Sequence, residues 1–152
     1  ARIPFEAAEQ ALTYDLAIDK KLIKINSLSM GNPHAVQVVE NVDTAPVATD
    51  GPAIESHPRF PKRVNAGFMQ VVDRHAVNLR VFERGVGETL ACGSGACAAA
   101  HVWAQRELLH AGWTVQVDVL GGTLYVDSDI DGVLTLRGPA ELTAKGEMLV
   151  DI

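Results

Sequence analysis

Residues 83–100 read ERGVGETLACGSGACAAA, which joins a charged pair, a glycine-rich loop, a cysteine and an alanine-rich segment. This order predicts the end of a strand, a loop, and a helix that begins just after Cys92. A cysteine placed before a helix meets exposed N–H groups and the positive end of the helix dipole, and both favour the nucleophilic, basic thiolate. The same N–H groups can hold an anionic ligand. We therefore expect the chemistry of this protein at Cys92.

The helix is expected over about residues 94–110. Ser94 suits its N-cap, and Gly112 lies just past its end, where glycine commonly terminates a helix. Apart from His101, the first three turns, from Ala96 to Ala104, contain only small or apolar residues. A helix without a polar face is a buried helix, and its small side chains let strands approach closely. The sequence therefore predicts one long central helix.

Short strands are expected before and after this helix. Most connections are too short for the crossover that parallel strands need. The sequence therefore predicts a single domain over residues 1–152, with an α+β fold in which a mostly antiparallel sheet forms a roll or open barrel around the central helix. A short additional helix is expected over residues 52–57. The expected strands cover residues 13–18, 22–28, 35–40, 64–72, 76–83, 114–120, 123–128, 133–136 and 148–151.

Composition and charge exclude several function classes. The net charge is −6 and there is no basic run, so binding to nucleic acid or to an anionic membrane is not expected. No apolar stretch approaches the roughly 18 residues needed to span a bilayer. The two cysteines are too few for a disulfide framework, which indicates a reducing, cytoplasmic setting.

Other kinds of site around Cys92 have weaker support. Cys97 falls inside the apolar helix and is expected to be a small buried hydrophobe. The two cysteines and five histidines show no CxxC or HxxxH spacing, so no metal site is expected. Gly85-x-Gly87 is not followed by Gly-Lys-Ser/Thr, so it does not form a phosphate-binding loop.

Covalent catalysis of the papain type needs a histidine base beside the cysteine. His34 could serve, but the glycine-rich approach to Cys92 differs from the local signatures of cysteine proteases. Glu83 and Arg84 are neighbours on an expected strand and should point to opposite faces. Where the Cys92 loop begins, one of them could adjust the pKa of the thiol while the other binds a carboxylate.

Four motifs together resemble the diaminopimelate epimerases. They are MGNPH at residues 30–34, NAGFM at 65–69, ERG at 83–85 and ACGSGA at 91–96, in the order and spacing of that family. The resemblance covers essentially the whole chain. The proline racemases share the Cys-Gly-x-Gly loop, but the other three motifs are similar to those of the diaminopimelate enzymes.

The resemblance implies a cofactor-independent, two-base epimerisation of LL-diaminopimelate to meso-diaminopimelate, in lysine and peptidoglycan precursor biosynthesis. One cysteine removes the α-proton, and a second cysteine on the opposite face of the carbon returns a proton. By resemblance, Cys92 is one of these bases. His34 and Glu83 are similar to the family residues that adjust the pKa of the cysteine pair, and Glu83 also resembles a substrate contact.

The resemblance also implies which residues hold the substrate. The N–H groups of Gly93 and Ser94 would bind the α-carboxylate, while Asn32, Asn65 and Arg84 would hold the distal amino-acid end. This assignment agrees with the chemistry. An α-proton is a very weak acid, so fixed N–H donors must stabilise the charge that develops toward the carboxylate, and excluding water strengthens them.

The family enzyme has two similar halves, each of which supplies one cysteine, and this chain contains only the second cysteine loop. We therefore expect it to be the C-terminal half, inactive without the half that carries the partner cysteine. The missing partner should leave an apolar surface exposed, through which two copies would associate. Residues 141–146 lack an aromatic residue of the kind associated with family dimer contacts, so a homodimer is left open.

Two alternative functions remain open from the sequence. One is a racemase or epimerase of a different amino acid on the same fold. The other is a non-catalytic binding module that keeps the fold without the chemistry. Convergence of Asn32, Asn65 and Arg84 on one pocket would favour the diaminopimelate substrate over other amino acids.

Overall fold

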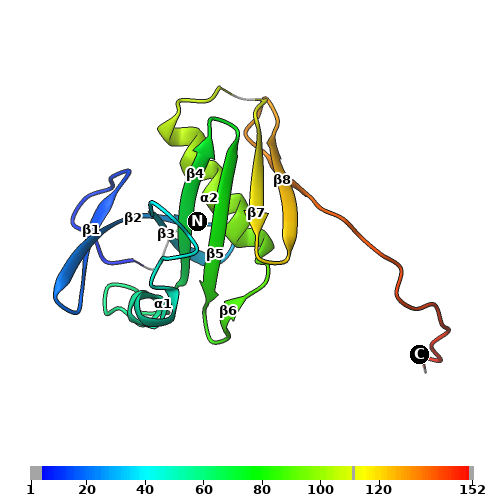
Figure 1. Ribbon diagram of the computed structural model, residues 1–152, viewed down its shortest axis with the longest axis horizontal. Coiled ribbons are helices and arrows are strands. Elements are labelled where there is room, and N and C mark those ends of the chain that lie inside the picture. Colours follow the sequence, from blue (N-terminus) through cyan, green and yellow to red (C-terminus); the bar gives the residue numbers. More distant parts are fainter. Residues whose placement is uncertain (1–4, 111, 151–152) are drawn as a thin grey trace.

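The computed structural model describes residues 5–110 and 112–150, which form nine strands and two helices (Figure 1). The α+β prediction is confirmed. The strands are β1 Tyr14–Ile18, β2 Lys21–Ser29, β3 Pro33–Val38, β4 Asn65–Asp73, β5 Ala76–Glu83, β6 Gly87–Thr89, β7 Thr114–Val119, β8 Gly122–Ser128 and β9 Leu134–Arg137, and the helices are α1 Val47–Glu55 and α2 Gly93–Arg106.

The strands form one mixed sheet in the order β1-β2-β3-β4-β5-β7-β8-β9, with β6 paired to β5. Six of the eight strand pairs are antiparallel, and two pairs, β3 with β4 and β5 with β7, are parallel. The parallel pairs arise because the two long connections, which contain α1 and α2, serve as crossovers. The six antiparallel pairs agree with the prediction of a mostly antiparallel sheet, which did not say which strands would pair in parallel.

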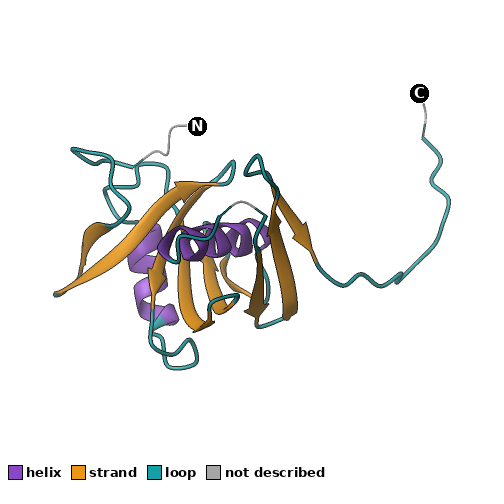
Figure 2. Cartoon of the chain, turned by 90° about the horizontal axis from the view of Figure 1, so that it is seen from above, coloured by secondary structure: helices purple, strands orange, loops and turns teal. Residues whose placement is uncertain are grey.

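The two helices cover opposite faces of the central strands. Successive residues of β5 point to opposite faces. A Cβ at Gly95 of α2 would lie 3.0 Å from the Val81 side chain, and a Cβ at Gly51 of α1 would lie 2.7 Å from Phe82. Glycine therefore permits close helix approach on both faces. Figure 2 shows α2 lying along the sheet, where it contacts β2, β3, β4, β5, β7, β8 and β9.

The ends of α2 differ from the prediction of residues 94–110. Cys92, not Ser94, is the N-cap, because its sulfur accepts the Gly95 N–H. The helix ends at Arg106, and Leu108 takes the left-handed conformation (φ 50°) that was expected of a glycine. His110 therefore lies outside the helix.

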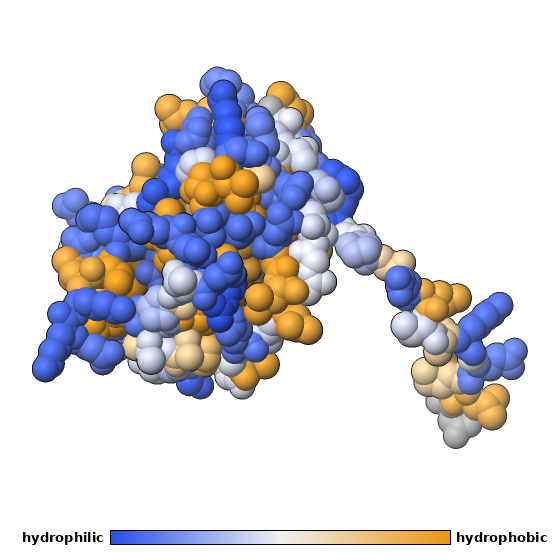
Figure 3. Space-filling view, in the orientation of Figure 1, coloured by the Kyte–Doolittle hydropathy of each residue, from blue (hydrophilic) through white to orange (hydrophobic). Residues whose placement is uncertain are grey.

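Two other predicted elements also differ from the structure. The short helix predicted over 52–57 runs from Val47 to Glu55 and contains Pro52, whose position suggested a helix start. The strand predicted over 148–151 was wrong for residues 148–150, which are exposed and irregular, and Asp151 lies outside the described residues. Residues 138–150 extend away from the body of the protein (Figures 1 and 3).

Within residues 5–110 and 112–150, no helix has both the length and the hydropathy required to cross a lipid bilayer.

Candidate active site

Cys92 lies at the first turn of α2, where the chain leaves the loop in an extended conformation (φ −136°, ψ 107°). Its sulfur accepts the Gly95 N–H at 3.3 Å and lies 3.6 Å from Ser94 Oγ. The side chain is buried, with 8% of the residue exposed. The helix dipole and these donors stabilise a negative charge on the sulfur, so the geometry suits a thiolate.

Ser94 joins this helix start to residues some 60 positions earlier in the chain. Asn32 Nδ2 donates to Ser94 Oγ at 3.2 Å, and His34 Nε2 lies 3.1 Å from both Ser94 Oγ and Asn32 Oδ1. Because Asn32 Oδ1 can only accept, Nε2 carries the ring proton and donates. The Ser94 hydroxyl proton is then left to point at the sulfur of Cys92.

His34 is fully buried on β3, with 1% of the residue exposed. Burial, assisted by the positive charge of Arg84, lowers the pKa of His34 to about 4. The imidazole is therefore neutral near pH 7. It reaches Cys92 through Ser94, so the geometry does not match a papain-like pair in which the histidine contacts the cysteine directly.

Asn65 and Arg84 meet where β4 begins and β5 ends. The Asn65 side chain accepts the backbone N–H of Arg84 at 2.9 Å and donates to the Pro33 carbonyl at 3.0 Å. The exposed Arg84 side chain donates from Nη1 to the Lys62 carbonyl at 3.0 Å. The buried Asn65 amide thus fixes the backbone that presents the guanidinium, a role that the sequence did not indicate.

Glu83 ends β5 and is half-buried. Its Oε1 accepts the hydroxyl of Thr89 at 2.5 Å. Thr89 Oγ1 also lies 3.4 Å from the Ala91 carbonyl, so Thr89 connects Glu83 to the residue before Cys92. Sequence reasoning missed Thr89, because nothing in its spacing distinguishes it from an ordinary strand residue.

The first two N–H groups of α2 are available to an anion. Gly95 N–H is taken by the Cys92 sulfur and Ala96 N–H by the Cys92 carbonyl. Among the residues that the structure describes, none accepts from the N–H groups of Gly93 and Ser94. These two donors lie beside the sulfur and form the positive end of the helix.

A family model for diaminopimelate epimerase matches residues 26–143. The chain belongs to the diaminopimelate epimerase family. It is 53% identical over 147 residues to the diaminopimelate epimerase of Nitrosospira multiformis and 54% identical over 147 residues to that of Nitrosomonas europaea. These alignments cover 96% of this chain but 52% and 53% of the relatives. The chain therefore spans about half the length of the curated relatives it matches.

A solved structure shares the fold at greater distance. The crystal structure of a phenazine biosynthesis protein of the PhzF family from Enterococcus faecalis matches with a TM-score of 0.50 and 22% identity. The match covers 69% of this chain and 38% of that one. At this identity the likeness concerns the fold alone.

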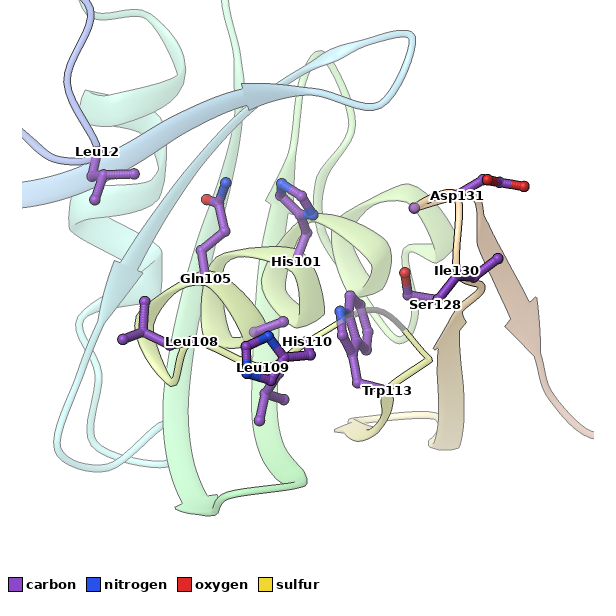
Figure 4. Close-up of a pocket in the computed structure, with 12 residues that line it drawn as sticks. Leu12, His101, Gln105, Leu108, Leu109, His110, Trp113, Ser128, Ile130 and Asp131 are labelled. Carbon is purple, nitrogen blue, oxygen red and sulfur yellow. The ribbon is translucent and has the colours of Figure 1, made fainter.

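A sizeable hollow of the described surface lies elsewhere on this epimerase-family chain. It has a volume of about 660 Å³ and lies beside the C-terminal half of α2. His101 and Gln105 project into it between Leu12 on one side and Ile130 on the other (Figure 4). None of the candidate site residues lines this hollow, so it is separate from the Cys92 site. No group of three metal-binding side chains occurs within the described ranges.

Proposed function

We propose that this chain supplies one catalytic cysteine and part of the substrate site of a diaminopimelate epimerase. The enzyme would convert LL-diaminopimelate to meso-diaminopimelate, in lysine and peptidoglycan precursor biosynthesis, without a cofactor. The observation that carries the proposal is that the Cys92 sulfur lies at the helix start whose Gly93 and Ser94 N–H groups have no acceptor among the described residues. A base and an anion-binding site are thus adjacent, as proton abstraction next to a carboxylate requires.

In this mechanism the Cys92 thiolate takes the α-proton and becomes a thiol. The electron pair of the broken C–H bond moves toward the α-carboxylate, where the N–H groups of Gly93 and Ser94 stabilise the charge. A second acid on the opposite face of the carbon then gives its proton to complete the inversion. The Ser94 hydroxyl, held by Asn32 and His34, stabilises the thiolate before the transfer.

The distal end of the substrate would meet Arg84 and Asn32. Arg84 is exposed beside the loop that leads to Cys92, and a guanidinium suits bidentate binding of a carboxylate. Glu83 would help to bind the substrate. As a nearby carboxylate, it would also adjust the pKa of the cysteine pair. Asn65 would act through the backbone of Arg84, which its side chain holds.

The second base would come from another part of the enzyme. Cys97 is the only other cysteine of the chain, and it lies on the same helix as Cys92. Burial and the charge of Cys92 raise the pKa of Cys97, which disfavours its thiolate. Cys97 lies in the second turn of the helix that Cys92 caps, so the two sulfurs would approach a substrate carbon from the same helix and not from opposite faces.

We propose that the chain is one domain, a roll around α2, and the C-terminal half of a two-half epimerase. The contacts of α2 with seven strands support the roll. Three apolar residues around the Cys92 loop, Val86, Leu90 and Leu120, are 72%, 69% and 53% exposed. They would pack against the other half, or against a second copy of this chain when that half is absent.

Solvent-deuterium incorporation at the α-carbon of diaminopimelate tests this proposal. The chain alone should give no sustained inversion, and the chain combined with the remaining half should convert LL- to meso-diaminopimelate with deuterium at the inverted carbon. Sustained inversion by the chain alone would contradict the two-half assignment. Absence of inversion in the folded, combined enzyme would contradict the function.

A further inference from the structure

A buried carboxylate at the end of α1 has no part in the proposed mechanism. Glu55 is 4% exposed, although glutamate is rarely buried without a partner. Its Oε1 accepts the backbone N–H of Gly85 at 2.6 Å, and its Oε2 accepts from Arg63 Nη2 at 2.7 Å. Both carboxylate oxygens are therefore used, one by a paired cation and one by the turn next to Arg84.

Two buried side chains hold the turn that carries Arg84, by accepting the successive N–H groups of Arg84 and Gly85. Asn65 Oδ1 accepts the N–H of Arg84 at 2.9 Å, and Glu55 Oε1 accepts the N–H of Gly85. Gly85 itself has a φ of 74°, a left-handed conformation that favours glycine. The backbone on each side of the Arg84 carbonyl is thus fixed by a buried side chain.

Glu55 also binds residues 62–64, the segment that accepts a hydrogen bond from the Arg84 guanidinium. Its own carbonyl accepts the N–H of Val64 at 3.1 Å, and its carboxylate pairs with Arg63. The neighbouring residue, Lys62, supplies the carbonyl that accepts from Arg84 Nη1. Glu55 therefore reaches Arg84 by two routes, through the turn at Gly85 and through the segment at residues 62–64.

Hydrogen bonds to an ionised group are shorter and about twice as strong as neutral ones. A buried carboxylate holds its donors with little freedom, because water does not compete for them. The N–H of Gly85 is therefore fixed more firmly than by a water molecule or a neutral side chain. Because the turn is already rigid, Arg84 loses less conformational entropy when it binds an anion.

We propose that Glu55 is a positioning residue that fixes Arg84 for the distal carboxylate of the substrate. This inference rests on the proposed function, because it takes Arg84 as the residue that binds that carboxylate. Glu55 contacts the turn and the adjacent segment, and acts on substrate only through Arg84.

The test uses a full-length epimerase that contains this chain, with the substitution Glu55→Gln. The KM for diaminopimelate should rise by about tenfold while kcat changes by less than about threefold, because uniform binding is lost. Asp50→Asn is the matched control. Asp50 is a buried carboxylate of the same helix that pairs with Lys21 and does not contact the turn, so KM should be unchanged.

A double-mutant cycle with Arg84→Gln separates positioning from a structural role. If Glu55 acts through Arg84, Glu55→Gln should raise KM no further in the Arg84→Gln background. Equal effects of Glu55→Gln in both backgrounds, or a fall in kcat with KM unchanged, would overturn the proposal. Arg63→Gln is a second variant, at an exposed side chain, and should raise KM in the same direction by a smaller factor.

The Gly85 amide resonance provides a readout that does not depend on activity. In the labelled full-length protein, Glu55→Gln should move the Gly85 amide proton upfield and lower the order parameters of residues 84–86, while Asp50→Asn should change neither. An unchanged Gly85 resonance would overturn the role of Glu55. An inactive parent enzyme with the expected Gly85 shift would instead contradict the proposed function.

Discussion

At the scale of single residues, the sulfur of Cys92 has two roles. It accepts the Gly95 N–H and so caps α2, and it is the proposed base. The same sulfur therefore holds the first turn of α2, which carries the N–H groups of Gly93 and Ser94.

His34 gives a prediction for the pH dependence of stability. Its pKa is about 4 in the folded protein, against 6.5 for an exposed histidine. Below about pH 6.5 His34 becomes protonated in the unfolded chain but stays neutral in the folded protein, down to about pH 4. The free energy of unfolding should therefore fall as the pH falls toward 4, by about 3 kcal/mol from this residue.

Urea denaturation of the wild type and of His34→Gln, at about pH 7 and pH 4, measures this effect. The wild type should lose about 3 kcal/mol more than the variant over this range, because the variant lacks the titrating group. Parallel pH profiles for the two proteins would show that burial does not hold His34 neutral.

The family resemblance named some of the residues that the structure brings together, and it did not indicate others. The predicted Asn32, His34 and Ser94 are hydrogen-bonded to one another, and Ser94 lies beside Cys92. The sequence did not indicate the proposed role of Glu55, because its contact with Gly85 joins positions 30 residues apart through a backbone amide that no side-chain pattern marks.

At the scale of elements, the C-terminus of α2 closes in a Schellman motif without glycine. The N–H of Leu109 donates to the Ala104 carbonyl at 2.9 Å, and that of Leu108 donates to the Gln105 carbonyl at 3.4 Å. Leu108 occupies the left-handed position of this motif. The sequence predicted a longer helix because the first glycine after it, Gly112, lies six residues beyond Arg106.

Leu108→Gly should stabilise the protein. A left-handed conformation costs an L-residue about 1 kcal/mol, and glycine adopts it without that cost, so the free energy of unfolding should rise by about 1 kcal/mol. Leu108 is 79% exposed, so little apolar burial is lost. Chemical denaturation measures the change, with the exposed Leu142→Gly as control, expected to change it by less than about 0.5 kcal/mol. Destabilisation by Leu108→Gly would show that the leucine side chain stabilises this end of the helix.

At the scale of the whole molecule, the sheet positions the site through two crossovers that pack on its opposite faces. The α1 crossover brings β3 and β4 together in parallel, so that His34 lies opposite Asn65. The α2 crossover begins at Cys92 and lies against the same strands. The sequence predicted the α+β class from the helix and the strands, but not these two parallel pairs, because they join distant segments.

Replacement of Cys92 by alanine in a full-length epimerase containing this chain is the most direct test of its role as a base. Epimerisation of LL-diaminopimelate, followed by deuterium incorporation at the α-carbon, should fall by about 10³-fold or more, because the proton acceptor is removed. Cys97→Ala, on the same helix, is the matched control and should retain most of the activity. A Cys92→Ala enzyme that is folded and inverts the substrate at nearly the original rate would contradict the assignment of Cys92 as a catalytic base.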